Sequence, residues 1–173
     1  ANSIKSEHSI DGSTITFTVH GKAAHGSVPQ LGINAISYAL NALNGVVDND
    51  FVRVYNKYIG TCVHGEKLGC FAEDEYGKIA VNVGLCKYEN GKFSIKINSR
   101  LPFTTDTNAM FNGIKATLKD EVCAKVVLMG QSEGFKIDPA SDMIKVLVNA
   151  YREVTGDATT KPICSAGGTY ARE

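Results

Sequence analysis

The sequence has 173 residues, of which 43% are hydrophobic, and this suffices for the core of one domain or of one domain and part of another. Its 18 Lys and Arg residues balance 18 Asp and Glu residues. With no basic run, and no apolar run near the roughly 20 residues of a membrane span, the composition argues against nucleic acid and membranes as partners.

Cysteine usage indicates the compartment. Five cysteines are widely spaced, and none of them forms a zinc-ribbon or CxxC pattern. We therefore expect reduced thiols in a cytoplasmic protein rather than a disulfide framework.

The first half of the chain predicts one strand and two helices. Ser13–Val19 alternates threonines with apolar residues, a period of two that is typical of a half-buried strand. The small residues of Gly21–Pro29 predict a loop. Apolar residues spaced by three and four then predict a helix over Asn34–Val47. A shorter helix is expected over Phe51–Ile59, and 61–77 has the character of a loop.

The second half predicts a hairpin, a helix and a strand. Lys78–Tyr88 and Lys92–Arg100 alternate in polarity on either side of Asn90-Gly91, a strong signal for a two-residue hairpin turn. A helix is expected from the N-cap Asp106 to Lys119, followed by a strand over Val122–Met129. The short extra helix aside, this order predicts an α+β, ferredoxin-like βαββαβ domain: one antiparallel sheet with two helices on one face.

The pattern changes after Gly130. A helix is expected from Ser141 to Val154 and ends at Gly156. The following Pro162–Arg172 is short and rich in small residues, and it lacks the partner strands that it would need. We therefore place a boundary near 131–138, which divides the chain into residues 1–132 and an incomplete second domain, residues 133–173.

The loop before the first helix contains the first candidate site residue. His25 lies among tiny residues, so a substrate backbone can come close to its imidazole. A histidine in that position can donate a hydrogen bond to a carbonyl oxygen that becomes negative in a transition state. From the residues alone, a loop histidine that caps a backbone carbonyl is the simpler interpretation.

Two further clusters can bind a substrate. Arg100 ends the second hairpin strand, and its planar guanidinium can hold a carboxylate in bidentate fashion, although an arginine there is more often a solvated charge. Paired glycines near the C-terminus allow backbone N–H groups to approach a ligand. The residues of this last cluster are Gly167, Gly168, Thr169, Tyr170 and Arg172.

Metal ligands are not predicted in this chain. His64 lies near Cys62 and Glu66, and only Cys70 is close enough in sequence to complete a four-ligand site. We interpret this histidine as structural.

Three strings in this sequence resemble motifs of one enzyme family. "GKAAHGSVPQLGINAI", "NSRLP" and "GGTYAR" are similar to segments of the zinc-dependent aminoacylases, carboxypeptidases and dipeptidases, and they follow the family order. The last string resembles the dipeptidase-V, or Xaa-His dipeptidase, branch. The compact hairpin also resembles a monomeric dipeptidase branch, and Asn90 serves its turn.

The resemblance implies a lid domain joined to a piece of a catalytic domain of a dipeptidase. It implies that His25 stabilises the oxyanion, that Arg100 binds the carboxylate of a dipeptide, and that the loop of residues 167–172 lines the substrate pocket. Two zinc ions are then bound by residues outside this sequence, so we expect no metal ion in this chain and no activity from it alone. A homodimer through an edge of the lid domain is a further expectation.

Two other classes of function are compatible with the sequence. One is a non-catalytic dimerisation or interaction module, which would expose an apolar strand or helix for pairing. The other is a ferredoxin-like regulatory domain that binds a small ligand.

Overall fold

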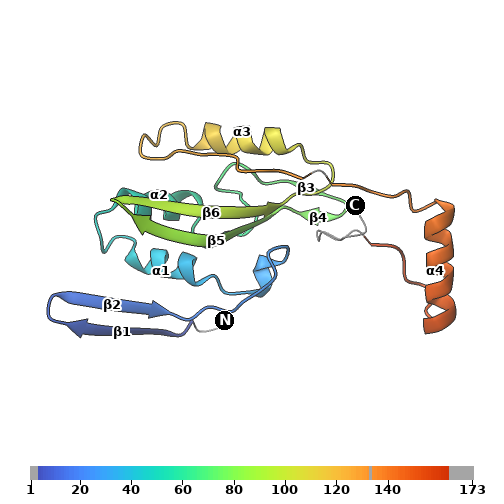
Figure 1. Ribbon diagram of the computed structural model, residues 1–173, viewed down its shortest axis with the longest axis horizontal. Coiled ribbons are helices and arrows are strands. Elements are labelled where there is room, and N and C mark those ends of the chain that lie inside the picture. Colours follow the sequence, from blue (N-terminus) through green and yellow to red (C-terminus); the bar gives the residue numbers. More distant parts are fainter. Residues whose placement is uncertain (1–3, 133, 164–173) are drawn as a thin grey trace.

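The computed structural model of the protein describes residues 4–132 and 134–163, and Figure 1 shows their arrangement. The elements in chain order are β1 (Ser6–Asp11), β2 (Thr14–Val19), the 3-10 helix η1 (Pro29–Leu31), α1 (Ala35–Leu43), α2 (Asp50–Tyr58), β3 (Glu73–Asp74), β4 (Gly77–Lys78), β5 (Ala80–Glu89), β6 (Lys92–Arg100), α3 (Thr107–Thr117) and α4 (Asp142–Thr155). Helices combined with antiparallel strands confirm the expected α+β class, and the arrangement is consistent with a ferredoxin-like lid domain.

The β5–β6 hairpin is the central element of the molecule, and its turn forms as the sequence predicts. Asn90 and Gly91 have φ angles of 52° and 75°, both in the left-handed region that a type I′ turn requires. Glu89 pairs with Lys92 across this turn, and the two strands stay antiparallel down to Arg100, which lies opposite Ala80.

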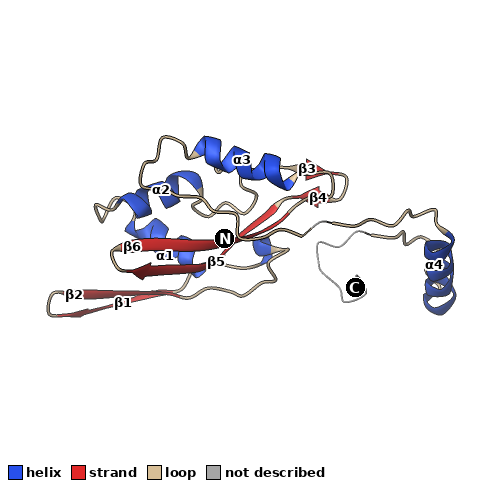
Figure 2. Ribbon diagram, turned by 45° about the horizontal axis from the view of Figure 1, so that its top comes forward, coloured by secondary structure: helices blue, strands red, loops and turns tan. Residues whose placement is uncertain are grey.

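One face of the β5–β6 hairpin packs against the helices to form the core. The buried residues are Leu40, Val52, Tyr55, Ile59, Leu68, Cys70, Ile79, Val81 and Val83. Met110, Ile114 and Leu118 of the α3 region pack against this cluster from another side. Side chains alternate across a strand, so Asn98 and Arg100 point away from the core face that Ile97 occupies. Figure 2 shows the hairpin among α1, α2 and α3.

The strands pair differently from the expected single sheet. Within the described residues they form three two-stranded antiparallel sheets: β1–β2, β3–β4 and β5–β6. β1 was not predicted as a strand, yet its six residues pair with β2 from Ser6–Val19 to Asp11–Thr14. Helix α1 contacts both β2 and β5 (Figure 1), so β2 lies beside the helix rather than beside the central hairpin.

The strand predicted over Val122–Met129 is wrong. The chain turns directly after Glu121, where the N–H of Ala124 donates to the carbonyl of Glu121 over 2.9 Å, and residues 124–132 form no strand. Val122 is fully exposed, and Met129 is also exposed. Alternating apolar residues supply the pattern of a strand but not its partner, and among the described residues no strand pairs with this segment.

The helices begin and end close to the positions that the sequence predicts, with one exception. Asp106 caps α3 by accepting a hydrogen bond from the N–H of Asn108, and Gly156 ends α4 with a φ of 72°. Helix α1 stops at Leu43 rather than at Val47, because Asn44 is extended and Gly45 is left-handed.

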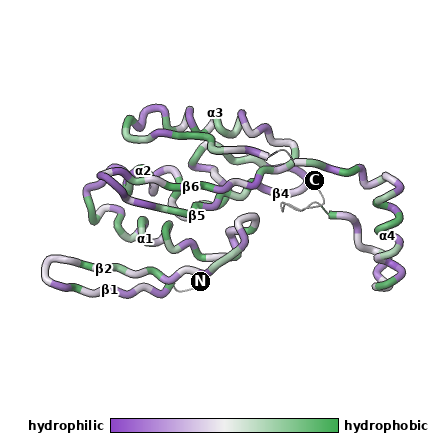
Figure 3. Tube along the Cα trace, in the orientation of Figure 1, coloured by the Kyte–Doolittle hydropathy of each residue, from purple (hydrophilic) through white to green (hydrophobic). Residues whose placement is uncertain are grey.

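Helix α4 stands apart from the other elements at the end of a long extended segment (Figure 1). Figure 3 shows hydrophobic residues along this helix, and those that are largely exposed are Met143, Val146, Leu147, Tyr151 and Val154. Among the residues described, no helix has the length and apolar character needed to cross a membrane.

Candidate functional site

The loop that carries His25 is a closed Ω-type loop. Its ends, Lys22 and Ile33, form an antiparallel bridge in which each N–H donates to the other residue's carbonyl, over 3.0 Å and 2.9 Å. Compact surface loops with such closely spaced ends are frequently functional. The bridge therefore presents the residues between its ends as one ordered unit.

Two glycines allow this bridge to close. A Cβ on Gly21 would lie 2.6 Å from the carbonyl oxygen of Ile33, and a Cβ on Gly32 would lie 2.7 Å from that of Lys22. Real Cβ atoms do not approach backbone oxygens so closely. Both positions therefore need glycine because of the close approach of two backbone segments.

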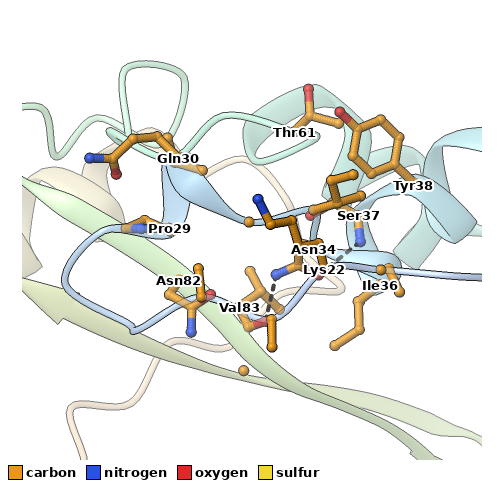
Figure 4. Close-up of a pocket in the computed structure, with 18 of the residues that line it drawn as sticks. Lys22, Pro29, Gln30, Asn34, Ile36, Ser37, Tyr38, Thr61, Asn82 and Val83 are labelled. Carbon is orange, nitrogen blue, oxygen red and sulfur yellow. Dashed lines mark hydrogen bonds between the residues drawn. The ribbon is translucent and has the colours of Figure 1, made fainter. Parts of the chain in front are cut away.

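Asn34 fastens the loop to both α1 and the central hairpin. Its Oδ1 accepts a hydrogen bond from the N–H of Ser37 and so caps the helix. Its Nδ2 donates to the carbonyl of Val83 on β5 over 2.8 Å, as the dashed line in Figure 4 marks. This one side chain sets the position of the loop relative to β5.

His25 is exposed, and one nitrogen of its ring is held by Ser27. The N–H of Ser27 donates to Nδ1 of His25 over 3.3 Å, and the Ser27 hydroxyl lies 2.8 Å from the same nitrogen. No hydrogen bond to Nε2 occurs within the described part of the chain. Ser27 thus engages Nδ1 and leaves Nε2 available for another hydrogen bond.

The neighbours of the His25 loop on the hairpin are two asparagines for which no role was predicted: Asn98, which begins the string NSRLP, and Asn82 on β5. A Cβ on Gly26 would lie 3.8 Å from Oδ1 of Asn98 and 3.9 Å from Nδ2 of Asn82, and these two residues pair across the strands. A β-bulge between Val83 and Leu85 creates this pairing. With the regular register of the turn, Asn82 would face Ser99 instead.

Arg100 lies on the same face of β6 as Asn98, about 7 Å further along the strand. Its side chain is half-buried, and its Nε atom is shielded from solvent without a hydrogen-bond partner among the described residues. The structure thus places Gly26, the neighbour of His25, beside Asn98, which lies two residues before Arg100 on the same strand face. The glycine cluster of residues 167–172 lies outside the described residues.

A cavity of about 470 Å³ lies behind the His25 loop, between α1 and β5. Figure 4 shows that Lys22, Gln30, Tyr38, Thr61 and Asn82 are among its lining residues. These side chains offer both hydrogen-bond donors and acceptors, and one positive charge.

The cysteine- and histidine-containing stretch after α2 is held by internal hydrogen bonds. Nδ1 of His64 lies 2.7 Å from the carbonyl of Ile79, so this nitrogen must be the donor. The thiol of Cys62 donates to Glu66, and this bond lowers the pKa of the Glu66 carboxyl. Among the described residues, no group of three or more His, Cys, Asp and Glu residues is arranged to hold a metal ion.

Comparison with known families gives one match. Residues 11–99 match the model of the M20 family described as "Peptidase dimerisation domain". The matched range begins at the end of β1 and ends on β6, so it includes the His25 loop and both asparagines.

Curated relatives match almost the whole chain. A protein of Staphylococcus haemolyticus named "Putative dipeptidase" is 34% identical over 179 residues, which cover 98% of this chain. Proteins with the same designation from Staphylococcus epidermidis and Staphylococcus aureus are each 32% identical, over 177 and 181 residues and 99% of this chain. The chain spans 37% of the length of each of these relatives.

Proposed function

This chain belongs to the M20 peptidase family through its dimerisation domain, and on that premise we propose that it is the lid part of a longer enzyme that hydrolyses dipeptides. The observation that carries the proposal is the exposed imidazole of His25 beside an open hairpin face that ends in Arg100. The names of the staphylococcal relatives support the same substrate class.

His25 supplies the oxyanion donor in this proposal. A peptide carbonyl becomes negative as water attacks it, and a donor already aimed at that oxygen stabilises the transition state more than the substrate. Nε2 of the ring is available for this role because Ser27 contacts the other nitrogen.

Arg100 binds the free carboxylate of the dipeptide. The guanidinium matches a carboxylate in bidentate geometry. The unpartnered, shielded Nε of Arg100 supports this role, because a buried donor without a hydrogen bond is costly and a carboxylate would satisfy it. We further propose that residues 167–172 line the same pocket.

In this proposal zinc is bound by the longer protein and not by this chain. In that protein two zinc ions would activate the attacking water. The described residues do not fit a metal ion, since no suitable group of ligands occurs among them. As the family resemblance implies, we propose that residues of the longer protein outside this chain hold the ions, and no step is assigned to them here.

The domain division follows the same proposal. Residues 1–132 would form the lid, and residues 133–173 would belong to the catalytic domain. Support comes from α4, whose apolar face is open and needs a covering surface, while the lid core is formed by α1, α2 and α3.

Single substitutions in the full-length enzyme test the proposal. Removing one oxyanion donor costs about 100- to 1,000-fold in turnover, and we expect that loss for His25→Ala. Arg100→Met should raise KM for a dipeptide strongly but leave hydrolysis of the corresponding dipeptide amide nearly unchanged, because the amide lacks the charge that Arg100 binds. Steady-state kinetics on both substrates measure these effects.

Lys96→Met is the matched control, because Lys96 is an exposed cation on the same face of β6. It should alter neither substrate's kinetics. A loss for His25→Ala under about threefold, far below the expected range, would remove His25 from the mechanism.

Dimerisation is a second function that a specific observation favours. The β1–β2 hairpin exposes apolar residues on one face, with Ile10 at 68%, Ile15 at 69% and Phe17 at 40% exposure. An isolated two-stranded sheet is only marginally stable in water. We propose that a second copy of the chain covers this face, in keeping with the description of the family.

A further inference from the structure

We propose that Ser27 is a positioning residue that fixes His25 in the tautomer with its proton on Nε2. The inference concerns the state of one ring in the His25 loop. Its relevance to catalysis rests on the proposed function, whereas the tautomer itself can be measured independently of any activity.

The direction of the hydrogen bonds determines the tautomer. A backbone N–H can only donate, so the bond from Ser27 N–H to Nδ1 requires a lone pair on that nitrogen. The Ser27 hydroxyl, 2.8 Å from Nδ1, then also donates. A neutral imidazole that accepts at Nδ1 carries its proton on Nε2.

The local turn holds Ser27 in this position. The N–H of Val28 donates to the carbonyl of His25 over 2.9 Å, which makes His25–Val28 a β-turn with Ser27 as its third residue. A side-chain acceptor on the first residue and an N–H on the third form the pattern of an Asx-turn, with the imidazole nitrogen in place of the carboxamide oxygen. The bridge between Lys22 and Ile33 orders the loop that contains this turn.

The alternative tautomer is unfavourable in this loop and unsuitable for the proposed chemistry. A proton on Nδ1 would face the N–H of Ser27, so two donors would oppose each other. It would also leave Nε2 as a lone-pair acceptor, which repels an oxyanion rather than stabilising it. Ser27 therefore acts through His25, without a contact to the substrate of its own.

Nitrogen NMR of the full-length enzyme labelled with ¹⁵N-histidine tests the inference. In a neutral histidine ring the two nitrogen shifts report which nitrogen carries the proton. We expect the His25 signals, identified by their loss in His25→Gln, to show a protonated Nε2. Ser27→Ala should shift the ring toward a mixture of tautomers, and Ser27→Thr should restore the original state.

We expect the turnover of the Ser27 variants to change in parallel with the tautomer of His25. We expect Ser27→Ala to lower kcat by about two- to tenfold, the effect of one neutral hydrogen bond, with KM little changed and with recovery in Ser27→Thr. Ser94→Ala, an exposed serine on β6, is the control and should change neither measurement.

A protonated Nδ1 in the unmodified protein overturns the inference. So does a Ser27→Ala variant with unchanged nitrogen shifts. A third outcome separates the two proposals. If the tautomer depends on Ser27 but the His25→Ala enzyme keeps full activity, the positioning role is upheld and the proposed function is contradicted.

Discussion

Glu121 shows how one residue can fasten two elements. It is only 9% exposed, and three donors from α2 hold its carboxylate: Arg53, Lys57 and Tyr58, each with a contact of 3.0 Å. These hydrogen bonds lower its pKa from an ordinary value to about 2. The segment that follows α3 is thereby fixed to α2, and the chain turns directly after Glu121.

This lowered pKa makes stability depend on pH. Because the folded state favours the charged carboxylate, its contribution is fully present above the unfolded pKa of about 4.3 and is lost as the pH falls from about 5 toward 2. We expect Glu121→Gln to be less stable at neutral pH and to lose less stability on acidification. Urea unfolding at a series of pH values measures both effects.

Glu89→Gln, at an exposed strand end, is the control for that series and should retain the acid dependence of the unmodified chain. An unchanged acid dependence in Glu121→Gln would contradict the role of this carboxylate.

At the scale of elements, the closure of the His25 loop depends on Gly21 and Gly32 as well as on the hydrogen bonds between Lys22 and Ile33. Gly21→Ala would force a Cβ to within 2.6 Å of the Ile33 carbonyl oxygen, and the bridge would have to open. Overpacking of this kind typically costs about 1–3 kcal/mol. We expect that loss in the free energy of unfolding, together with a drop in turnover of the full-length enzyme.

Gly130→Ala is the matched control for Gly21→Ala. Nothing lies within 4 Å of a Cβ at Gly130, and its φ is not in the left-handed region. Equal stability of the two variants in urea unfolding would show that the bridge tolerates a side chain.

Local elements were predictable where local chemistry decides them. The Asn90-Gly91 turn and the Asp106 and Gly156 helix ends formed as expected, because each depends on a few neighbouring residues. The bulge between Val83 and Leu85 was not predictable, since it depends on how β5 meets its partners. It is this bulge that brings Asn82 opposite Asn98 and beside the His25 loop.

At the scale of the whole molecule, two apolar surfaces are uncovered. One consists of the exposed apolar residues of α4, which we propose are covered by a catalytic domain of the longer protein, and the other is the face of the β1–β2 hairpin that holds Ile15 and Phe17. Surfaces of this kind mark interfaces in soluble proteins.

A charge on the hairpin face tests the proposed homodimer. We expect Ile15→Lys to shift the full-length protein from dimer to monomer in sedimentation velocity, because a lysine cannot be buried there without a partner. Thr16→Lys places the same charge on the opposite face of β2 and should leave the dimer intact. A monomeric unmodified protein, or a dimer that persists in Ile15→Lys, would contradict this interface.

The sequence by itself determined the class of the fold, most element boundaries and the loop that carries His25. These follow from periodicity, caps and turn residues, which act over a few neighbouring positions. Only the tertiary structure decided which strands pair, that Val122–Met129 forms no strand, and that the His25 loop lies beside Asn98, two residues before Arg100. Strand pairing and register depend on contacts between distant residues, and a local pattern does not specify those contacts.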